Sequence, residues 1–256
     1  MKITSLLLAA ISAIALCTAN ASRPSWREHF DWVTPQGPVI TQEFDLGAFD
    51  SINVSCITDV TFRQSDVHRV VVRARENMMG YVNISVRNNS LVFNSVINDT
   101  NTRIDTRHLD DNEPTFELIV YAPSLLSATF SGMTRAIDWD TISGDMFRLV
   151  VSGMLNAEID FDVQVLLVDG SGMADLSLLG TTHVLNANVS GMVNLDSSSL
   201  AAAEVDVIAS GMANAIVYAS SSLRIGASGM ASVFYLGSAP HISYSETGMA
   251  TIRPRR

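Results

Sequence analysis

The chain has 256 residues, of which 47% are hydrophobic and 16% are charged, and its formal net charge at pH 7 is −10. This excess of acids argues against the basic patch that phosphate backbones require, so nucleic acid is not expected as a partner. The single lysine, Lys2, lies at the extreme N-terminus, which leaves no lysine nucleophile or Schiff base in the rest of the chain.

Residues 1–21 have the features of a secretory signal peptide. Lys2 supplies the positive start, an apolar run follows at residues 6–16, and Ala19-Asn20-Ala21 is a small-x-small cleavage site. We therefore predict cleavage between Ala21 and Ser22. The protein is then expected in the periplasm or on the outer surface of a bacterial envelope.

Two alternatives to cleavage are weaker. A transmembrane span needs roughly 20 apolar residues, and neither the leader nor any later stretch reaches that length. Lipidation of Cys17 would place the bulky Leu16 where such sites take a small residue. After the leader, Cys56 is the only cysteine, so no internal disulfide and no cysteine-based metal site is expected.

The region before the repeats divides into two parts. Residues 22–38 contain three prolines and no periodicity, which predicts a flexible leading segment. Residues 39–125 alternate apolar and polar residues as β-strands do, and the polar run 98–112 predicts a long exposed loop. We expect these irregular strands to form the first coils and the cap of a larger β-structure built by the repeats.

Seven tripeptides then recur at a period near 19, with successive glycines separated by 18 to 21 residues. They are Ser131, Gly132, Met133; Ser152, Gly153, Met154; Ser171, Gly172, Met173; Ser190, Gly191, Met192; Ser210, Gly211, Met212; Ser228, Gly229, Met230; and Thr247, Gly248, Met249. Such a period is typical of a solenoid in which each repeat is one coil. We assign residues 126–252 to a seven-repeat solenoid and residues 253–256 to a basic tail.

The residues around each glycine predict which side chains face inward. The columns six and four residues before glycine are apolar in every repeat, whereas the column between them is mostly polar. These two columns are Leu126, Phe147, Leu166, Leu185, Val205, Leu223, Ile242 and Ala128, Leu149, Val168, Ala187, Val207, Ile225, Tyr244. Positions four and six after glycine repeat the pattern, except in the first repeat, where Ala136 and Asp138 predict an irregular coil. The fold class is therefore all-β: a parallel β-helix or β-solenoid with about 19 residues per turn and a length of roughly 30 Å.

Each residue of the tripeptide has a structural explanation. Glycine permits a sharp corner, serine bonds its hydroxyl to the turn, and the flexible methionine stacks on its counterparts in an irregular corner. The alternative is a ladder of thioethers that binds Cu(I), a soft ion that accepts methionine sulfur. Because no histidine or cysteine accompanies the tripeptide, the structural explanation is preferred, and no metal and no cofactor are predicted.

Catalytic patterns are weak. The five histidines have no metal-ligand spacing, and no nucleophile elbow, phosphate loop or dinucleotide fingerprint occurs. Acids at Asp138, Asp140, Asp160 and Asp162 could line one face, as in carbohydrate-cleaving solenoids, but a solvated charged face explains them as well. No catalytic residues are predicted.

Several phrases resemble one bacterial envelope family, the putative auto-transporter adhesin, head GIN domain. The resemblance runs from a strand phrase at residues 49–55, through Asp59-Val60-Thr61-Phe62 and residues 120–125, to Ser-Gly corners such as residues 171–175 and 210–214. It covers roughly residues 44–252, and it departs where methionine replaces a small residue and where Cys56 stands at a glycine position. It implies a β-solenoid at the envelope, an adhesin-like role and no catalytic residues.

Three functions are hypotheses at this point. The first is a non-enzymatic binding or scaffold protein of the cell envelope, adhesin-like, whose partner is a protein or a glycan lying along one face. The alternatives are a carbohydrate-active enzyme on the same solenoid, and an envelope assembly protein that stacks end to end as a homo-oligomer.

Overall fold

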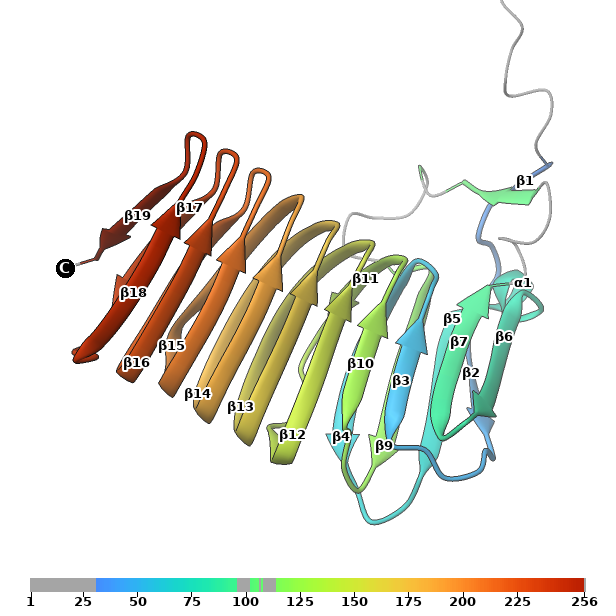
Figure 1. Cartoon of the computed structure of the whole chain (residues 1–256). Coiled ribbons are helices and arrows are strands. Elements are labelled where there is room, and N and C mark those ends of the chain that lie inside the picture. Colours follow the sequence, from blue (N-terminus) through green and yellow to red (C-terminus); the bar gives the residue numbers. More distant parts are fainter. Residues whose placement is uncertain (1–30, 96–101, 106, 108–113, 256) are drawn as a thin grey trace, which may run out of the picture.

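The chain folds into a stack of parallel coils (Figure 1). The computed structural model describes residues 31–95, 102–105, 107 and 114–255. About 70% of the structure is strand and 2% is helix, and the coils number about 7 with roughly 19 residues each. The predicted all-β parallel solenoid is therefore confirmed. The predicted leader and the cleavage site at Ala21 and Ser22 lie outside the described residues.

The repeats build the regular part of the solenoid. Its strands are β10 (Ser127–Phe130), β11 (Met133–Ala136), β12 (Ile142–Val151), β13 (Met154–Gly170), β14 (Met173–Val189), β15 (Met192–Ala209), β16 (Asn214–Ala227), β17 (Ser232–Leu236), β18 (His241–Glu246) and β19 (Thr251–Pro254). Neighbouring coils pair in parallel, so that Leu166 lies beside Leu185 and Leu185 beside Val205. Each of the strands β13, β14 and β15 runs without interruption from the methionine after one corner glycine to two residues before the next corner glycine. Each of these coils therefore has one tight corner, at its glycine.

The coils before the repeats are stacked in an order that differs from the sequence. The strands are β3 (Ser51–Val54), β4 (Thr58–Gln64), β7 (Ser90–Ser95) and β9 (Phe116–Ala122). The coil of β3 and β4 lies between the coil of β7 and β9 on one side and the first repeat, β10 and β11, on the other.

Antiparallel strands close the N-terminal end of the stack. They are β2 (Val39–Phe44), which pairs with β5 (Arg69–Arg75), and β6 (Val82–Arg87), which pairs with β7. The short helix α1 (Glu76–Met79) joins β5 to β6 and places Met78 in the core with no exposed surface. Within the predicted leading segment and loop, β1 (Asp31–Val33) and β8 (Thr102–Ile104) form a separate parallel pair.

The core follows the predicted columns in the middle of the stack. Leu149, Val168, Val207 and their neighbours are buried, as are the inward positions after glycine. The prediction that Leu126 faces the core is wrong, because its side chain is 52% exposed. The strand β10 begins at Ser127, and the side chain buried just before it is that of Leu125. The prediction is also wrong at Ile242 and Tyr244, which are 43% and 62% exposed, because β18 pairs only with β16 among the described strands.

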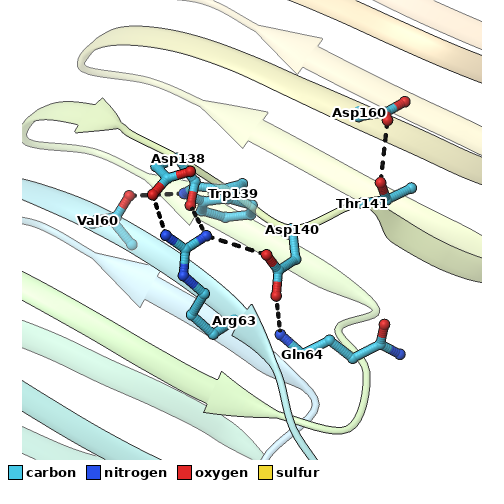
Figure 2. Close-up of polar contacts among 8 residues, drawn as sticks. All are labelled: Val60, Arg63, Gln64, Asp138, Trp139, Asp140, Thr141 and Asp160. Atoms are coloured by element: carbon cyan, nitrogen blue, oxygen red, sulfur yellow. Dashed lines mark hydrogen bonds and ion pairs between the residues drawn. The ribbon is translucent and has the colours of Figure 1, made fainter.

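The first repeat is irregular, as predicted (Figure 2). After β11 the backbone turns at Asp138, whose φ is +55°, and Trp139 folds back into the core. The Trp139 indole Nε1–H donates to the Val60 carbonyl oxygen at 2.8 Å, and its ring packs on Phe62 and Phe130. In the later coils the sixth position after glycine faces the core, as at Ile159, whereas in the first repeat the buried side chain is Trp139, at the seventh position.

Candidate binding face along the glycine corners

The glycine corners form a file along one side of the stack, and the early ones are too tight for a side chain. A Cβ added to Gly172 would lie 2.0 Å from the Gly153 carbonyl oxygen, and one added to Gly153 would lie 2.1 Å from that of Gly132. From Gly191 onward the corner glycines also have positive φ, for example +74° at Gly229, where a side chain is strained. Glycine is therefore required in the early coils because neighbouring backbones approach closely, and in the later coils because the backbone has positive φ.

Hydrogen bonds tie each corner to the one before it. The Ser171 and Ser190 hydroxyls donate to the carbonyl oxygens of Val151 and Gly170, at 3.3 and 3.4 Å. The backbone N–H of each methionine after the first donates to the glycine carbonyl of the preceding corner, at 2.8 to 3.1 Å. This continuous chain of bonds fixes the corner residues in register from one coil to the next.

The seven methionines of the tripeptides, here called the methionine ladder, lie on the outside of this file. Their exposed fractions range from 36% at Met154 to 75% at Met249. Met133, Met154, Met173 and Met192 are direct register partners in adjacent strands. They are adjacent from one coil to the next, but their exposure shows that burial in an irregular corner does not account for them.

A second file of polar side chains runs beside the methionines, at the third position after glycine. This polar ladder consists of Asn156, Asp175, Asn194 and Asn214, which are register partners in β13 to β16. The Asn194 amide donates to Asp175 Oδ1 at 2.6 Å, and the Asn214 amide donates to Asn194 Oδ1 at 3.0 Å. The side chains are therefore oriented before any ligand arrives.

Two open hollows lie along these ladders. One, of about 470 Å³, lies over the polar ladder and is also lined by Glu158, Ser177 and Asp196. The other, of about 430 Å³, is lined by four residues of the methionine ladder and shares three residues of the polar ladder with the first. We call the surface formed by both ladders and these hollows the corner face.

The polar ladder was not predicted from the sequence. The predicted columns are those that face the core, whereas the ladder stands at an outward position between them. The signal was present, because Asn or Asp stands three residues after glycine in four consecutive repeats. Repeated polar residues in an outward column are therefore the pattern that identifies such a ladder.

The acids considered for carbohydrate cleavage have structural partners (Figure 2). Arg63 binds both Asp138 and Asp140, and Asp140 also accepts the Gln64 backbone N–H at 2.8 Å. The hydrogen bond that Arg63 donates to Asp138, together with the charges of both carboxylates, raises the pKa of Arg63. These two acids hold the irregular first repeat against β4.

The other two acids of that set bond to threonines of neighbouring coils. Asp160 accepts the Thr141 hydroxyl at 3.1 Å, and Asp162 accepts the Thr181 hydroxyl at 3.0 Å. Their hydrogen bonds link coil to coil. Among the described residues, no group of three or more His, Cys, Asp or Glu is placed to hold a metal ion.

Cys56 lies at the corner of the coil before the repeats. It is 5% exposed, and a Cβ on Gly132 would lie 2.3 Å from its carbonyl oxygen, so it stands below the first glycine corner. Burial raises the pKa of the Cys56 thiol from its ordinary 9.0 to about 12. The thiol is therefore protonated at neutral pH and a poor nucleophile.

This pKa shift predicts a loss of stability at alkaline pH. Between pH 9 and 12 the unfolded chain loses the thiol proton and the folded chain keeps it, so the unfolding free energy falls as pH rises. Relative to Cys56→Ala, the wild type should lose about 2 kcal/mol between pH 8 and pH 10.5. Urea unfolding of both proteins at the two pH values measures the difference, and parallel pH curves would contradict it.

The described part of the chain has no helix with the length and hydrophobicity that a bilayer span requires.

No curated protein matches the chain. Among the solved structures that share the fold over their whole length are three bacterial proteins. A putative adhesin from Bacteroides fragilis has a TM-score of 0.80 and 21% identity, and covers 87% of this chain and 100% of its own.

The other two come from Parabacteroides distasonis, and each covers 88% of this chain and 100% of its own. One is a putative adhesin with a TM-score of 0.64 and 18% identity. The other is a putative lipid binding protein with a TM-score of 0.62 and 16% identity. The profile of one family matches residues 48–239, three quarters of the chain, and the chain therefore belongs to the family of the putative auto-transporter adhesin, head GIN domain.

Proposed function

We propose that this protein is a non-enzymatic, adhesin-like binding module of the bacterial cell envelope, and that it holds an extended neutral glycan along the corner face. The observation that carries this proposal is the polar ladder. Four amide or carboxylate side chains from consecutive coils are aligned beside an open hollow, and three of them, Asp175, Asn194 and Asn214, are cross-bonded. A linear ligand with repeating polar groups matches a surface that itself repeats every coil.

The chemistry of the hollow favours a neutral glycan over other ligands. Amides and carboxylates offer donors and acceptors to sugar hydroxyls, which both donate and accept. The residues that line this hollow include three acids, Glu158, Asp175 and Asp196, and no basic residue. An anionic polymer would therefore be repelled. In the adjoining hollow the only cation is Arg135, and its guanidinium is bound to both Asp59 carboxylate oxygens at 2.7 Å.

Secretion and envelope location form part of the same proposal. They rest on the leader sequence at residues 1–21, with cleavage before Ser22, and on membership of an adhesin-like family. Mass spectrometry of the protein from bacterial fractions tests this. A mature N-terminus at Ser22 supports secretion, whereas the intact leader in a cytoplasmic fraction contradicts it.

Glycan arrays probed with the full chain test the ligand. Asn194→Ala removes the central member of the polar ladder, which bonds to both neighbours, and should weaken glycan binding at least tenfold. Asn188→Ala is the matched control, because Asn188 is an exposed asparagine of β14 that lines neither hollow of the corner face. Its binding should equal that of the wild type.

Three results would overturn the proposal. Arrays without any bound glycan would remove the ligand class, and capture of matrix proteins instead would favour a protein partner. Equal binding by the Asn194 and Asn188 variants would move the site elsewhere. Release of reducing ends from any bound polysaccharide would show that the protein is an enzyme.

A further inference from the structure

The methionines of the ladder are exposed, yet the residue type at this position is the same in every repeat. The position after glycine is methionine in all seven repeats, although every one of these side chains is at least 36% exposed. Other outward positions of the same repeats vary widely. The fifth position after glycine holds Ile137, Glu158, Ser177, Asp196, Ile216, Phe234 and Arg253. The repeats have therefore diverged at this outward position, whereas the position after glycine has not changed.

Packing does not explain this constraint, because the methionine side chains lie outside the core. An apolar stripe for docking a partner does not explain it either, since leucine, isoleucine and valine supply apolar surface equally well. Methionine differs from these residues in its unbranched, flexible side chain and in its polarisable sulfur, which has a free lone pair. A role that requires the thioether itself accounts for seven methionines in seven exposed positions.

The spacing of the methionines along the stack allows those of two adjacent coils to bind one ion together. Adjacent parallel strands lie about 4.8 Å apart, so the methionine Cα atoms recur at that spacing, and hydrogen bonds at every corner hold the register. Metal–sulfur bonds in proteins are about 2.3 Å long, as for zinc, so two sulfurs on one ion are at most about 4.6 Å apart. The three rotatable bonds of each side chain allow that small adjustment. Sulfurs two coils apart, at about 9.6 Å, are too far to share an ion.

The charge balance of the chain favours a positive ion, because the chain as a whole carries a net charge of −10. Asp175 stands two residues after Met173 in β14, and Arg135, which stands two residues after Met133 in β11, is paired with Asp59 at 2.7 Å. Thioethers are soft ligands that select Cu(I) over hard ions such as Mg²⁺ and Ca²⁺.

We propose that the methionine ladder binds Cu(I), with each ion held between the thioethers of two adjacent coils. Seven methionines shared in pairs hold at most about three ions per chain. Because a thioether has no proton to release, binding should be the same at pH 7 and pH 5. Sites built from histidine or cysteine weaken over that range. The proposal rests on different side chains from the glycan proposal, and either can fail without the other.

The test measures Cu(I) bound to the full chain under anaerobic conditions, against a colorimetric Cu(I) chelator. All proteins carry Cys17→Ala and Cys56→Ala, which removes both thiols of the chain. The reference protein should bind about three ions with the same affinity at pH 7 and pH 5.

Two triple variants with equal numbers of substitutions separate shared ions from isolated ones. Substituting Met154, Met192 and Met230 by leucine leaves four methionines with no adjacent partner, and should abolish binding. Substituting Met212, Met230 and Met249 by leucine leaves four adjacent methionines, and should retain about two ions. Met146→Leu, at a 51% exposed methionine of β12 outside the ladder, should change nothing.

Circular dichroism and melting curves verify that each variant is folded. Equal binding by the two triple variants would overturn the pairing, because independent thioethers would bind alike in both. Absence of binding in the reference protein, or a loss of binding at pH 5, would overturn the proposal as a whole.

Discussion

Gly172→Ala is expected to prevent stable folding of the solenoid. The added Cβ would lie 2.0 Å from the Gly153 carbonyl oxygen, which is backbone and cannot rotate away as a side chain would. That oxygen also accepts the Met173 N–H at 3.0 Å, so moving it breaks the bond between two corners. We expect a loss of at least about 4 kcal/mol of unfolding free energy, or no folded protein at all.

Gly226→Ala is the matched control for that substitution. An added Cβ there meets only the Ile208 side chain, at 3.7 Å, and the backbone of Gly226 does not have positive φ. Alanine in this strand should leave stability unchanged or raise it by about 0.5 kcal/mol. Chemical denaturation followed by circular dichroism compares the two. Equal stabilities would show that the corners have room for a side chain.

Trp139→Ala is expected to destabilise the protein by about 4 kcal/mol. The ring is 8% exposed and lies between Phe62 and Phe130, with centroid distances of 5.8 and 6.2 Å, so its removal leaves a cavity in the irregular coil. It also leaves the Val60 carbonyl oxygen without the indole donor.

Trp139→Phe separates these two contributions. Phenylalanine keeps most of the apolar volume and loses only the N–H, so the cost should fall to about 1–2 kcal/mol. Denaturation midpoints followed by circular dichroism give both values, since the substitution removes a fluorescent residue. Similar losses in both variants would assign the effect to the hydrogen bond and not to packing.

The sequence predicts the repeating half of the fold well because each coil carries its own signals. Glycine marks the corner, and alternation on either side of it determines which side chains face the core, as at Leu166 and Val168. Parallel pairing of identical coils then needs no further information, because each strand stacks on its copy one period away.

The order of the first coils could not be predicted in this way. The coil of β3 and β4 has Cys56 at its corner in place of glycine, and no period relates it to β7 and β9. Alternation shows that these strands have a buried face, but it does not choose their partners, which are set by long-range packing. The prediction of burial was wrong in the last coil for a related reason. Ile242 and Tyr244 would be buried only if a further coil covered them, and alternation in the sequence does not show whether such a coil is present.

The candidate site was predicted only in part. The methionine column was evident from the repeats, but its exposure was not, because an apolar side chain beside a glycine corner is compatible with either side of the coil. The polar ladder needed three-dimensional register, since its hydrogen bonds join residues 19 and 20 positions apart.

The two ends of the stack are unlike, and this limits how copies can associate through them. A head-to-tail fibre needs two ends that continue one parallel arrangement, and the N-terminal end is covered by the antiparallel strands β2, β5 and β6. The opposite end, at β18 and β19, displays inward-column side chains such as Tyr244 to solvent. Two copies that met through this end would use the same surface on both, which gives a two-fold symmetric pair.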